Sequence, residues 1–285
     1  MGWRITDRLD EYAAAALPFL RERPVLHNVS LTVLETLRAG RVYPEPPLFG
    51  WWTDRNGAVG GAFSHTPPFT LLLATVPDEA LEPLAEALVG WGRPLAGVHG
   101  TRRTAPLFAD AWARRTGCGA RVSLEQRLYA LGSLTTPDPA PPGRARQASD
   151  ADTDLLTEWT RRFNRDAGMP DANTPEVVQD KLGYGGWFLW EAAGVPVALA
   201  GLTRPGGGVI RVGPVFTPEE HRRLGYGSAV TAAASRAALD RAADAVVLFT
   251  DLANPTSNSI YQRLGYRAVE DRLILLFDGS DVIGR

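Results

Sequence analysis

The chain contains 285 residues, of which 45% are hydrophobic, and its 30 basic and 32 acidic side chains leave a net charge of -2 at pH 7. This length suits about two domains of ~150 residues each. A near-neutral charge argues against a nucleic-acid-binding protein, which usually carries a basic stripe. The single cysteine, Cys118, excludes an internal disulfide and a cysteine-rich metal site.

The sequence predicts a cytoplasmic protein with no membrane partner and no nucleic-acid partner, acting as a monomer or a homodimer. The apolar stretch at residues 12–20 is short, contains Pro18 and follows acidic residues, unlike a secretory signal. No stretch approaches the ~18 apolar residues of a membrane span. A lone cysteine fits a reducing compartment.

Elements of the first half follow from periodicity and turn residues. A hairpin is expected around Asn56-Gly57, a strong turn signal. Trp51 and Trp52 point to opposite faces of their strand, so at most one is expected in the core. Strands are expected over residues 48–54, 57–65, 69–75, 95–100 and 120–131, and helices over residues 77–91 and 104–117.

A proline-rich stretch, residues 132–143, separates the two halves. It contains four prolines and has no apolar periodicity, which predicts an extended, semi-rigid linker. The expected domains are therefore residues 1–131 and residues 144–285, each large enough for its own core.

The second half predicts the element order β-α-α-β-β-β-α-β-α-β. The first half shows the later part of the same order, and residues 114–131 resemble residues 262–277. We therefore expect an α/β fold, with a mixed central sheet flanked by helices, and a diverged internal duplication. Strands are expected at 145–149, within 187–204, and at 208–217, 245–250 and 266–277, and helices at 152–166, 174–183, 228–243 and 254–265.

The stretch HRRLGYGSA, residues 221–229, carries the pattern R-x-x-G-x-G between a predicted strand and a predicted helix. Within a helix, glycine lowers stability by roughly 1 kcal/mol relative to alanine. The presence of Gly225 and Gly227 at a predicted helix start therefore calls for an explanation. Free N–H groups at a helix start, together with the helix dipole, form a ready anion site. A glycine-rich helix start without a ligand is the simpler alternative.

Two other phosphate-binding loops do not fit this stretch. The P-loop needs a Gly-Lys pair, and the only lysine, Lys181, is preceded by aspartate. The dinucleotide fingerprint needs a third glycine, but the position three residues after Gly227 is Val230.

Together with a second motif nearer the C-terminus, this pattern resembles the cofactor-binding motifs of the GNAT superfamily of N-acetyltransferases. Arg222, Gly225 and Gly227 resemble its coenzyme A pyrophosphate loop. Asn254, followed by Tyr261 and the pair Gly265-Tyr266, resembles its second cofactor motif. The resemblance covers roughly residues 144–277, whereas the first half matches only in element order.

The resemblance implies acetyl-CoA as cofactor and a role for each matching residue. The backbone near the end of the strand would pair with the pantetheine arm, and backbone N–H groups from Arg223 to Ser228 would hold the pyrophosphate. Tyr261 would be the catalytic acid that protonates the leaving thiolate, which suits a tyrosine hydroxyl. The cofactor-binding residues implied are Val215, Phe216, Thr217, Arg222, Arg223, Leu224, Gly225, Tyr226, Gly227, Ser228, Asn254 and Ser257.

The same resemblance implies that Gly213-Pro214 bends its strand away from residues 245–250 to admit the thioester. A general base is not evident, because Asp251 would as readily cap a loop, and Glu219 and Glu220 would as readily supply first-turn charge. The four histidines lack metal-ligand spacing, so no metal is expected.

The expected function is transfer of an acetyl group from acetyl-CoA to a small-molecule or peptide amine by direct attack. A non-catalytic acyl-CoA sensor or scaffold is the alternative. The first half has VPDEA, residues 76–80, where the glycine loop would stand. Its acids would repel a diphosphate, so one cofactor site per chain is expected.

Overall fold

The computed structural model describes residues 1–171 and 174–279 and divides into two compact units. The first unit comprises Met1–Arg127 together with the segment that begins at Glu270. The second unit comprises Leu128–Val269 and contains both glycine-bearing motifs. Each unit is described by itself.

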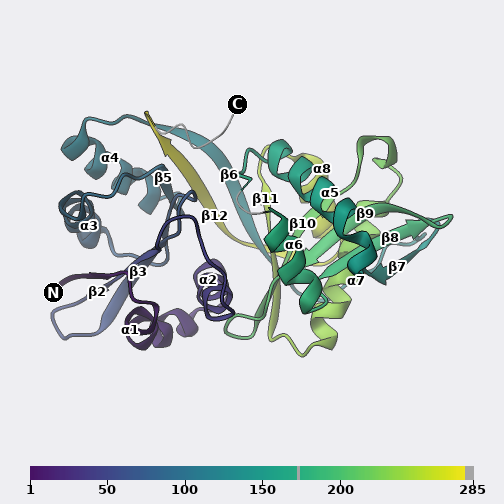
Figure 1. Cartoon of the computed structure of the whole chain (residues 1–285), viewed down its shortest axis with the longest axis horizontal. Helices are drawn as coiled ribbons and strands as arrows, with labels where there is room; N and C mark the ends of the chain where they lie inside the picture. The colour runs from purple at the N-terminus through teal and green to yellow at the C-terminus, as the bar shows by residue number, and fades with distance from the viewer. Residues whose placement is uncertain (172–173, 280–285) are drawn as a thin grey trace. The chain divides into compact units, whose positions relative to one another are not determined.

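The first half of the chain forms the elements β-α-α-β-β-β-α-β-α-β (Figure 1). Every strand and helix expected between residues 48 and 131 is present, and β2 pairs antiparallel with β3 around the expected turn. The bounds are β1 Gly2–Thr6, α1 Leu9–Glu22, α2 Asn28–Arg38, β2 Leu48–Thr53, β3 Val59–His65, β4 Leu71–Leu73, α3 Asp78–Trp91, β5 Gly97–Thr101, α4 Thr104–Thr116 and β6 Ala120–Leu131.

The second half forms the same order of elements, which confirms the order expected for it. Both halves thus run β-α-α-β-β-β-α-β-α-β, a repetition that the expected duplication would produce. The bounds are β7 Arg144–Gln147, α5 Thr153–Asp166, α6 Thr174–Gly183, β8 Trp187–Ala192, β9 Val195–Leu202, β10 Val209–Phe216, α7 Tyr226–Asp240, β11 Ala245–Asp251, α8 Pro255–Arg263 and β12 Tyr266–Phe277.

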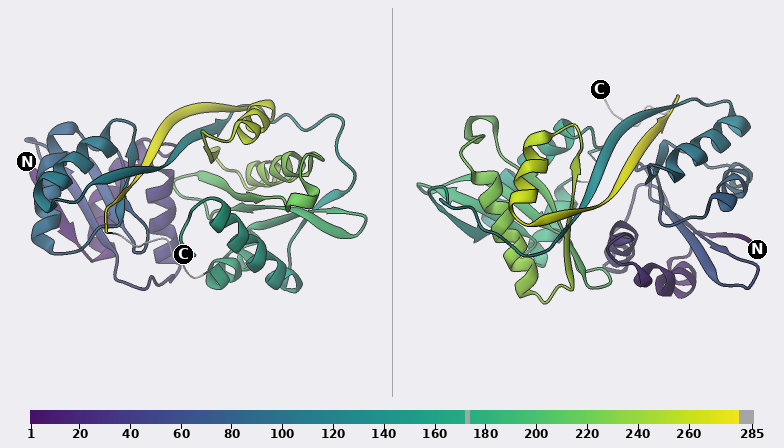
Figure 2. Two further views of the ribbon diagram at one scale, coloured as in Figure 1. Left: turned by 90° about the horizontal axis from the view of Figure 1, so that it is seen from above. Right: turned by 180° about the vertical axis from the view of Figure 1, so that it is seen from behind.

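The second unit is a mixed sheet with helices on both faces. Strand β10 pairs antiparallel with β9 and parallel with β11. Helices α5 and α6 cover one face, and α7 and α8 cover the other (Figure 2, left). Successive side chains of β9 alternate between these layers, as a strand requires. Leu199 packs with α5 and α6, whereas Ala198 and Ala200 pack with α7.

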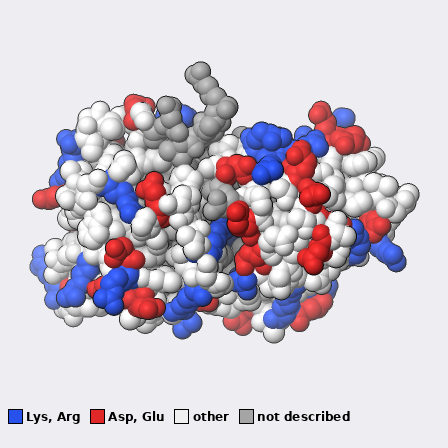
Figure 3. All heavy atoms as spheres, viewed as in Figure 1, with Lys and Arg blue, Asp and Glu red and all other residues white. Residues whose placement is uncertain are grey.

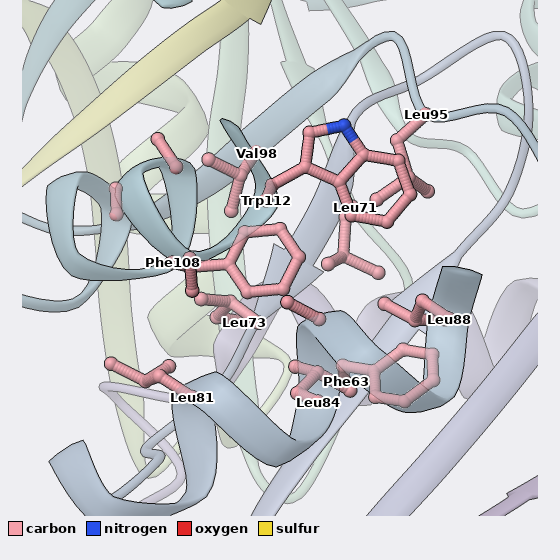
Figure 4. Packing of buried hydrophobic residues seen from close by; sticks show 14 of the residues in the cluster. Phe63, Leu71, Leu73, Leu81, Leu84, Leu88, Leu95, Val98, Phe108 and Trp112 are labelled. Carbon is pink, nitrogen blue, oxygen red and sulfur yellow. The ribbon is translucent and has the colours of Figure 1, made fainter. Parts of the chain in front are cut away.

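The first unit has the same layering, and it corrects the expectation for the paired tryptophans. Trp51 and Trp52 are 5% and 3% exposed, so both are core residues. They do face opposite sides of β2, but helices cover both sides of this sheet. Figure 4 shows the side formed with α3 and α4, where Phe63 and Leu73 face Leu84 and Phe108.

The last strand of the chain contributes to the first unit. Arg272–Leu276 of β12 pairs antiparallel with Gly97–Thr101 of β5. Leu273, Leu275 and Phe277 lie in the core that α3 and α4 cover. The first unit is therefore completed by residues that follow the second unit in sequence.

The proline-rich stretch is held to the second unit at both of its ends. The amide of Gly132 donates to the carbonyl of Gly265 at 3.0 Å, and that of Thr135 donates to Leu264 at 3.0 Å. At the other end, Trp190 Nε1 donates to the carbonyl of Pro142 at 2.9 Å. The stretch thus belongs to the structure of the second unit.

Basic and acidic side chains are interspersed over the face shown in Figure 3. The two arginines at 102 and 103 each pair with a carboxylate, Arg102 with Glu125 and Arg103 with Asp78. These pairs are exposed and contribute little to stability. Among the described residues, no helix is both long and apolar enough to cross a membrane.

Candidate functional site

Strand β10 separates from β11 halfway along its length. Its parallel register with β11 runs from Val209 to Arg211. Its register with β9 shifts between Val212 and Val215, which marks a β-bulge at Gly213-Pro214. A bulge bends its strand, and Pro214 has no N–H to donate to a neighbouring strand. The position of the bend agrees with the expectation for this pair of residues.

Beyond the bulge, Val215 and Phe216 pair with Ala200 and Leu199 of β9. Phe216 is also anchored by its side chain, which lies 5.9 Å from the ring of Trp159. This anchoring leaves the β11 side of the strand end as the edge on which an extended molecule could add backbone hydrogen bonds.

Lys181, on α6, supports the bulge, and sequence reasoning gave it no role. Its ammonium donates to the carbonyl of Gly213 at 3.2 Å and to that of Leu202 at 2.8 Å. It also lies 5.1 Å from the centre of the Trp187 ring, and the residue is 9% exposed. The sequence feature that could have indicated a role is that Lys181 is the single lysine among 30 basic residues.

The turn after β10 carries Arg222, whose side chain binds the protein. Its Nε donates to the carbonyl of Thr217 at 3.1 Å, and its terminal nitrogen lies 3.3 Å from a carboxylate oxygen of Asp166 on α5. This side chain therefore ties the turn to the end of β10 and to α5.

The two glycines of the turn are favoured for different local reasons. Gly225 has φ +85°, and its hypothetical Cβ would lie 3.5 Å from Pro141, an ordinary contact. Left-handed backbone, rather than lack of space, thus favours glycine there. Gly227 is different, because a Cβ would lie 3.2 Å from the hydroxyl of Thr217. Room for a ligand, the reason expected from the sequence, is not needed to explain either residue.

Helix α7 begins at this turn with an open N-terminus. Gly225 is the N-cap, and no side chain caps the helix. The first helical bond is donated by Ala229 to the carbonyl of Gly225 at 3.0 Å. Within the described residues, no hydrogen-bond acceptor is found for the amides of Tyr226, Gly227 and Ser228. Such amides, with the helix dipole, attract an anion.

Helix α8 presents the second motif. Asn254 is its N-cap, and its side-chain oxygen accepts from the amide of Ser257 at 3.0 Å. Pro255 follows at the first helical position, where its missing N–H costs nothing. The side chain that was expected to contact the cofactor thus also has a local role in starting the helix.

Tyr261 lies in the core of the second unit, 8% exposed. Burial raises the pKa of its hydroxyl to about 12, although a hydrogen bond with Ser257 opposes that rise. The hydroxyl is therefore protonated at neutral pH and can donate a proton or a hydrogen bond. Its ring meets that of Tyr266 edge-on, with centroids 6.1 Å apart.

The candidate bases have local roles. The carboxylate of Asp251 accepts from the amide of Ala253 at 2.8 Å, so it caps the turn before α8. Glu219 and Glu220 form an exposed 3-10 turn. In the described part of the chain, no group of three His, Cys, Asp or Glu side chains is arranged to hold a metal ion.

Comparison with known proteins places this arrangement in a family. Residues 153–266 match the model of the acetyltransferase (GNAT) family. The fold is similar to a GCN5-related N-acetyltransferase from Sphaerobacter thermophilus, with a TM-score of 0.64 and 15% identity over 96% of this chain and 94% of that one. No curated protein sequence matches the chain.

Two further structures are similar over nearly the whole chain. An acetyltransferase from the GNAT family of Colwellia psychrerythraea gives a TM-score of 0.60 and 10% identity, covering 97% of this chain and 99% of that one. A tandem GNAT protein from the clavulanic acid biosynthesis pathway gives a TM-score of 0.58 and 12% identity, covering 96% and 98% respectively. At these identities the similarity shows the fold.

Residues 153–266 are a GNAT acetyltransferase domain, which confirms the resemblance of the two motifs. The matched residues 153–266 include the glycine turn, the open start of α7 and Tyr261. The enzyme class of the chain is therefore acyltransferase.

Proposed function

We propose that this chain transfers an acetyl group from acetyl-CoA to the amine of a small-molecule or peptide acceptor. One observation carries the proposal: the open start of α7 follows the turn at the end of β10, where β10 has separated from β11. An anion-binding helix start and a free strand edge in succession suit a ligand that has a diphosphate at one end and an amide-bearing arm at the other.

The cofactor would be held mainly by backbone. The amides of residues 223–228 would bind the pyrophosphate, and Val215, Phe216 and Thr217 would bond the pantetheine arm. Arg222 would act by shaping the turn, because its guanidinium binds Thr217 and Asp166. Asn254, whose side-chain oxygen accepts from the amide of Ser257, would have its side-chain N–H groups left to donate to the arm.

The reaction would be a direct transfer. The amine nitrogen attacks the thioester carbonyl carbon, the C–N bond forms, and collapse of the tetrahedral intermediate breaks the C–S bond. Tyr261 would give its hydroxyl proton to the departing sulfur, the attacking nitrogen would release a proton to solvent, and Tyr261 would then regain a proton from solvent. Backbone N–H groups near the bulge would stabilise the oxyanion.

Two features of the first unit support the expectation of a single cofactor site per chain. There the first turn of α3 carries two acidic residues, Asp78 and Glu79, and the carboxylate of Asp78 already binds Arg103. The side chain of Arg272 is buried and donates to the carbonyl of Leu73, at the end of β4. The strand end that would correspond to the pantetheine edge thus already has an internal partner.

A screen of amines with acetyl-CoA tests the proposed activity. Thiol release that depends on both the amine and the enzyme, with an acetylated product found by mass spectrometry, is the expected result. Binding of coenzyme A without transfer to any amine, peptide amines included, would favour the sensor alternative.

A further inference from the structure

Tyr129 is a buried tyrosine for which the proposed reaction has no use. It lies near the end of β6, in the part of this strand that belongs to the second unit, and its exposed fraction is 0%. Its hydroxyl donates to Oδ1 of Asn258 at 2.9 Å and accepts from Nε2 of Gln262 at 3.3 Å. Both partners are on α8, the helix that carries Tyr261.

The two partners are placed so that one hydroxyl can set the rotation of the helix. Asn258 and Gln262 are four residues apart and therefore share one face of α8. Tyr261 lies three residues after Asn258 and one before Gln262. Its direction about the helix axis is therefore fixed once the face that carries Asn258 and Gln262 is held against Tyr129. A rotation of α8 would break at least one of the two bonds.

Asn258 extends the connection to the end of β11. Its side-chain amide donates to the carbonyl of Asp251 at 2.9 Å and to that of Asn254 at 2.8 Å. The same side chain thus bonds Tyr129 through its oxygen and the start of α8 through its nitrogen. All the polar atoms of this half-buried amide are used, so its hydrogen bonds hold the side chain in one orientation.

The C-terminal end of α8 is held by the residues that follow Tyr129. The amides of Gly132 and Thr135 donate to the carbonyls of Gly265 and Leu264, each at 3.0 Å. These carbonyls lie just beyond α8, where a helix leaves acceptors without partners. Residues 129–135 therefore fasten both the side and the end of this helix.

We propose that Tyr129 is a positioning residue for Tyr261: its hydroxyl fixes the rotation of α8 and thereby the direction of the catalytic hydroxyl. The inference rests on the proposed function of Tyr261. It also assigns a role in the site to a residue outside the matched residues 153–266, from the half of the chain that has no glycine loop.

The first test is a double-mutant cycle in the full chain with Tyr129→Phe and Tyr261→Phe. Tyr129→Phe should lower kcat about 10-fold, while the KM for acetyl-CoA stays within about 2-fold, since a misdirected acid slows the chemical step. In the Tyr261→Phe background the same substitution should change kcat less than about 2-fold, because the group that it positions is gone. Equal losses in both backgrounds would overturn the proposal.

The second test does not depend on activity. Amide hydrogen exchange in Tyr129→Phe should become faster in α8, Pro255–Arg263, and stay unchanged in α7. Tyr184→Phe is the control, since it removes the hydroxyl of a half-buried tyrosine, bonded to the carbonyl of Leu202 at 2.9 Å, without touching α8. Unchanged exchange in α8 of Tyr129→Phe would overturn the inference even if acetyl transfer occurs. Faster exchange without any acetyl transfer would instead count against the proposed function.

Discussion

At the scale of single residues, Tyr261 is the clearest chemical group of the site. We expect Tyr261→Phe to lower kcat by ~10²–10⁴-fold, the usual contribution of a positioned general acid, because the substitution removes the proton donor and almost no volume. Affinity for coenzyme A should stay within about 3-fold. Steady-state kinetics and calorimetry measure the two quantities.

A second outcome separates catalysis from packing. If Tyr261→Phe turns over like the wild type, the residue serves the core only. If it loses coenzyme A affinity as well, the hydroxyl contacts or shapes the cofactor site rather than the leaving group.

The pH dependence of the wild type is set by the direction of the Tyr261 pKa shift. Burial raises this pKa to about 12. In the proposed reaction the protonated form is the active one, so its contribution is present below that pH and lost only as pH rises through it. We therefore expect no loss of kcat through Tyr261 between pH 7 and pH 10. A decline within this range that Tyr261→Phe abolishes would show that the hydroxyl ionises there.

Gly225 tests the backbone of the turn. Gly225→Ala places a side chain at φ +85°, which costs roughly 1–2 kcal/mol in left-handed backbone, and the turn should relax away from its present shape. Coenzyme A affinity should fall at least about 10-fold, equal to 1.4 kcal/mol. The matched control is Gly40→Ala, at φ +92° in the first unit, where no described residue beyond its two chain neighbours has an atom within 4 Å of the added Cβ. Equal affinity in both variants would contradict the role of the turn.

At the scale of elements, turn chemistry and hydrophobic periodicity were sufficient to predict most of the order. The hairpin at Asn56-Gly57 and the glycine turn before α7 were predicted because each needs particular backbone angles. No element was expected from the sequence where β1, α1 and α2 lie. Pro18 lies inside α1, and in the sequence it served only as an argument against an export signal.

The burial of Trp51 and Trp52 was not predictable from alternation alone. The alternation of side chains along a strand predicts which residues share a face, but it does not predict which faces are covered by helices. The coverage depends on α1 and α2, two helices that the sequence analysis did not predict, so one tryptophan was expected at the surface.

The start of α5 makes stability depend on pH. Asp152, 8% exposed, accepts from Arg146 at two oxygens, each 2.8 Å away, and from the amide of Ser149, and these bonds lower its pKa to about 2. Because the folded pKa lies below the unfolded value, the contribution is present above about pH 4 and lost as pH falls toward 2. Asp152→Asn should cost about 2 kcal/mol at pH 7.

Urea unfolding of wild type and Asp152→Asn at pH 7 and at about pH 3 measures this contribution. The difference between the two proteins should shrink at the lower pH. A constant difference would mean that the ion pair with Arg146 is not its source.

At the scale of the whole molecule, each compact unit contains a segment from the other half of the chain. Residues from Leu128 belong to the second unit, and residues from Glu270 belong to the first. A single sequence shows a proline-rich stretch and suggests a boundary there, but it does not show which distant strands pair. The pairing of β12 with β5, and the bonds of Tyr129, therefore had no signal in the sequence.

This exchange predicts that the second half is not independent. A fragment of residues 144–285 lacks Tyr129, Gly132 and Thr135, which hold α8. It should unfold at least about 10 °C below the full chain, or fail to stay soluble, because several polar groups in and just after α8 lose their hydrogen-bond partners. Thermal unfolding followed by circular dichroism decides it. A fragment that melts with the full chain and binds coenzyme A equally well would contradict this account.

The central claim is that the turn at Gly225 and the open start of α7 bind the diphosphate of coenzyme A. Isothermal titration calorimetry of the full chain with coenzyme A, ATP and NAD tests it most directly, with Gly225→Ala as the comparison. We predict saturable binding of one coenzyme A per chain, weakened in Gly225→Ala, and no measurable binding of ATP or NAD. Binding of ATP or NAD in the absence of coenzyme A binding would contradict the account.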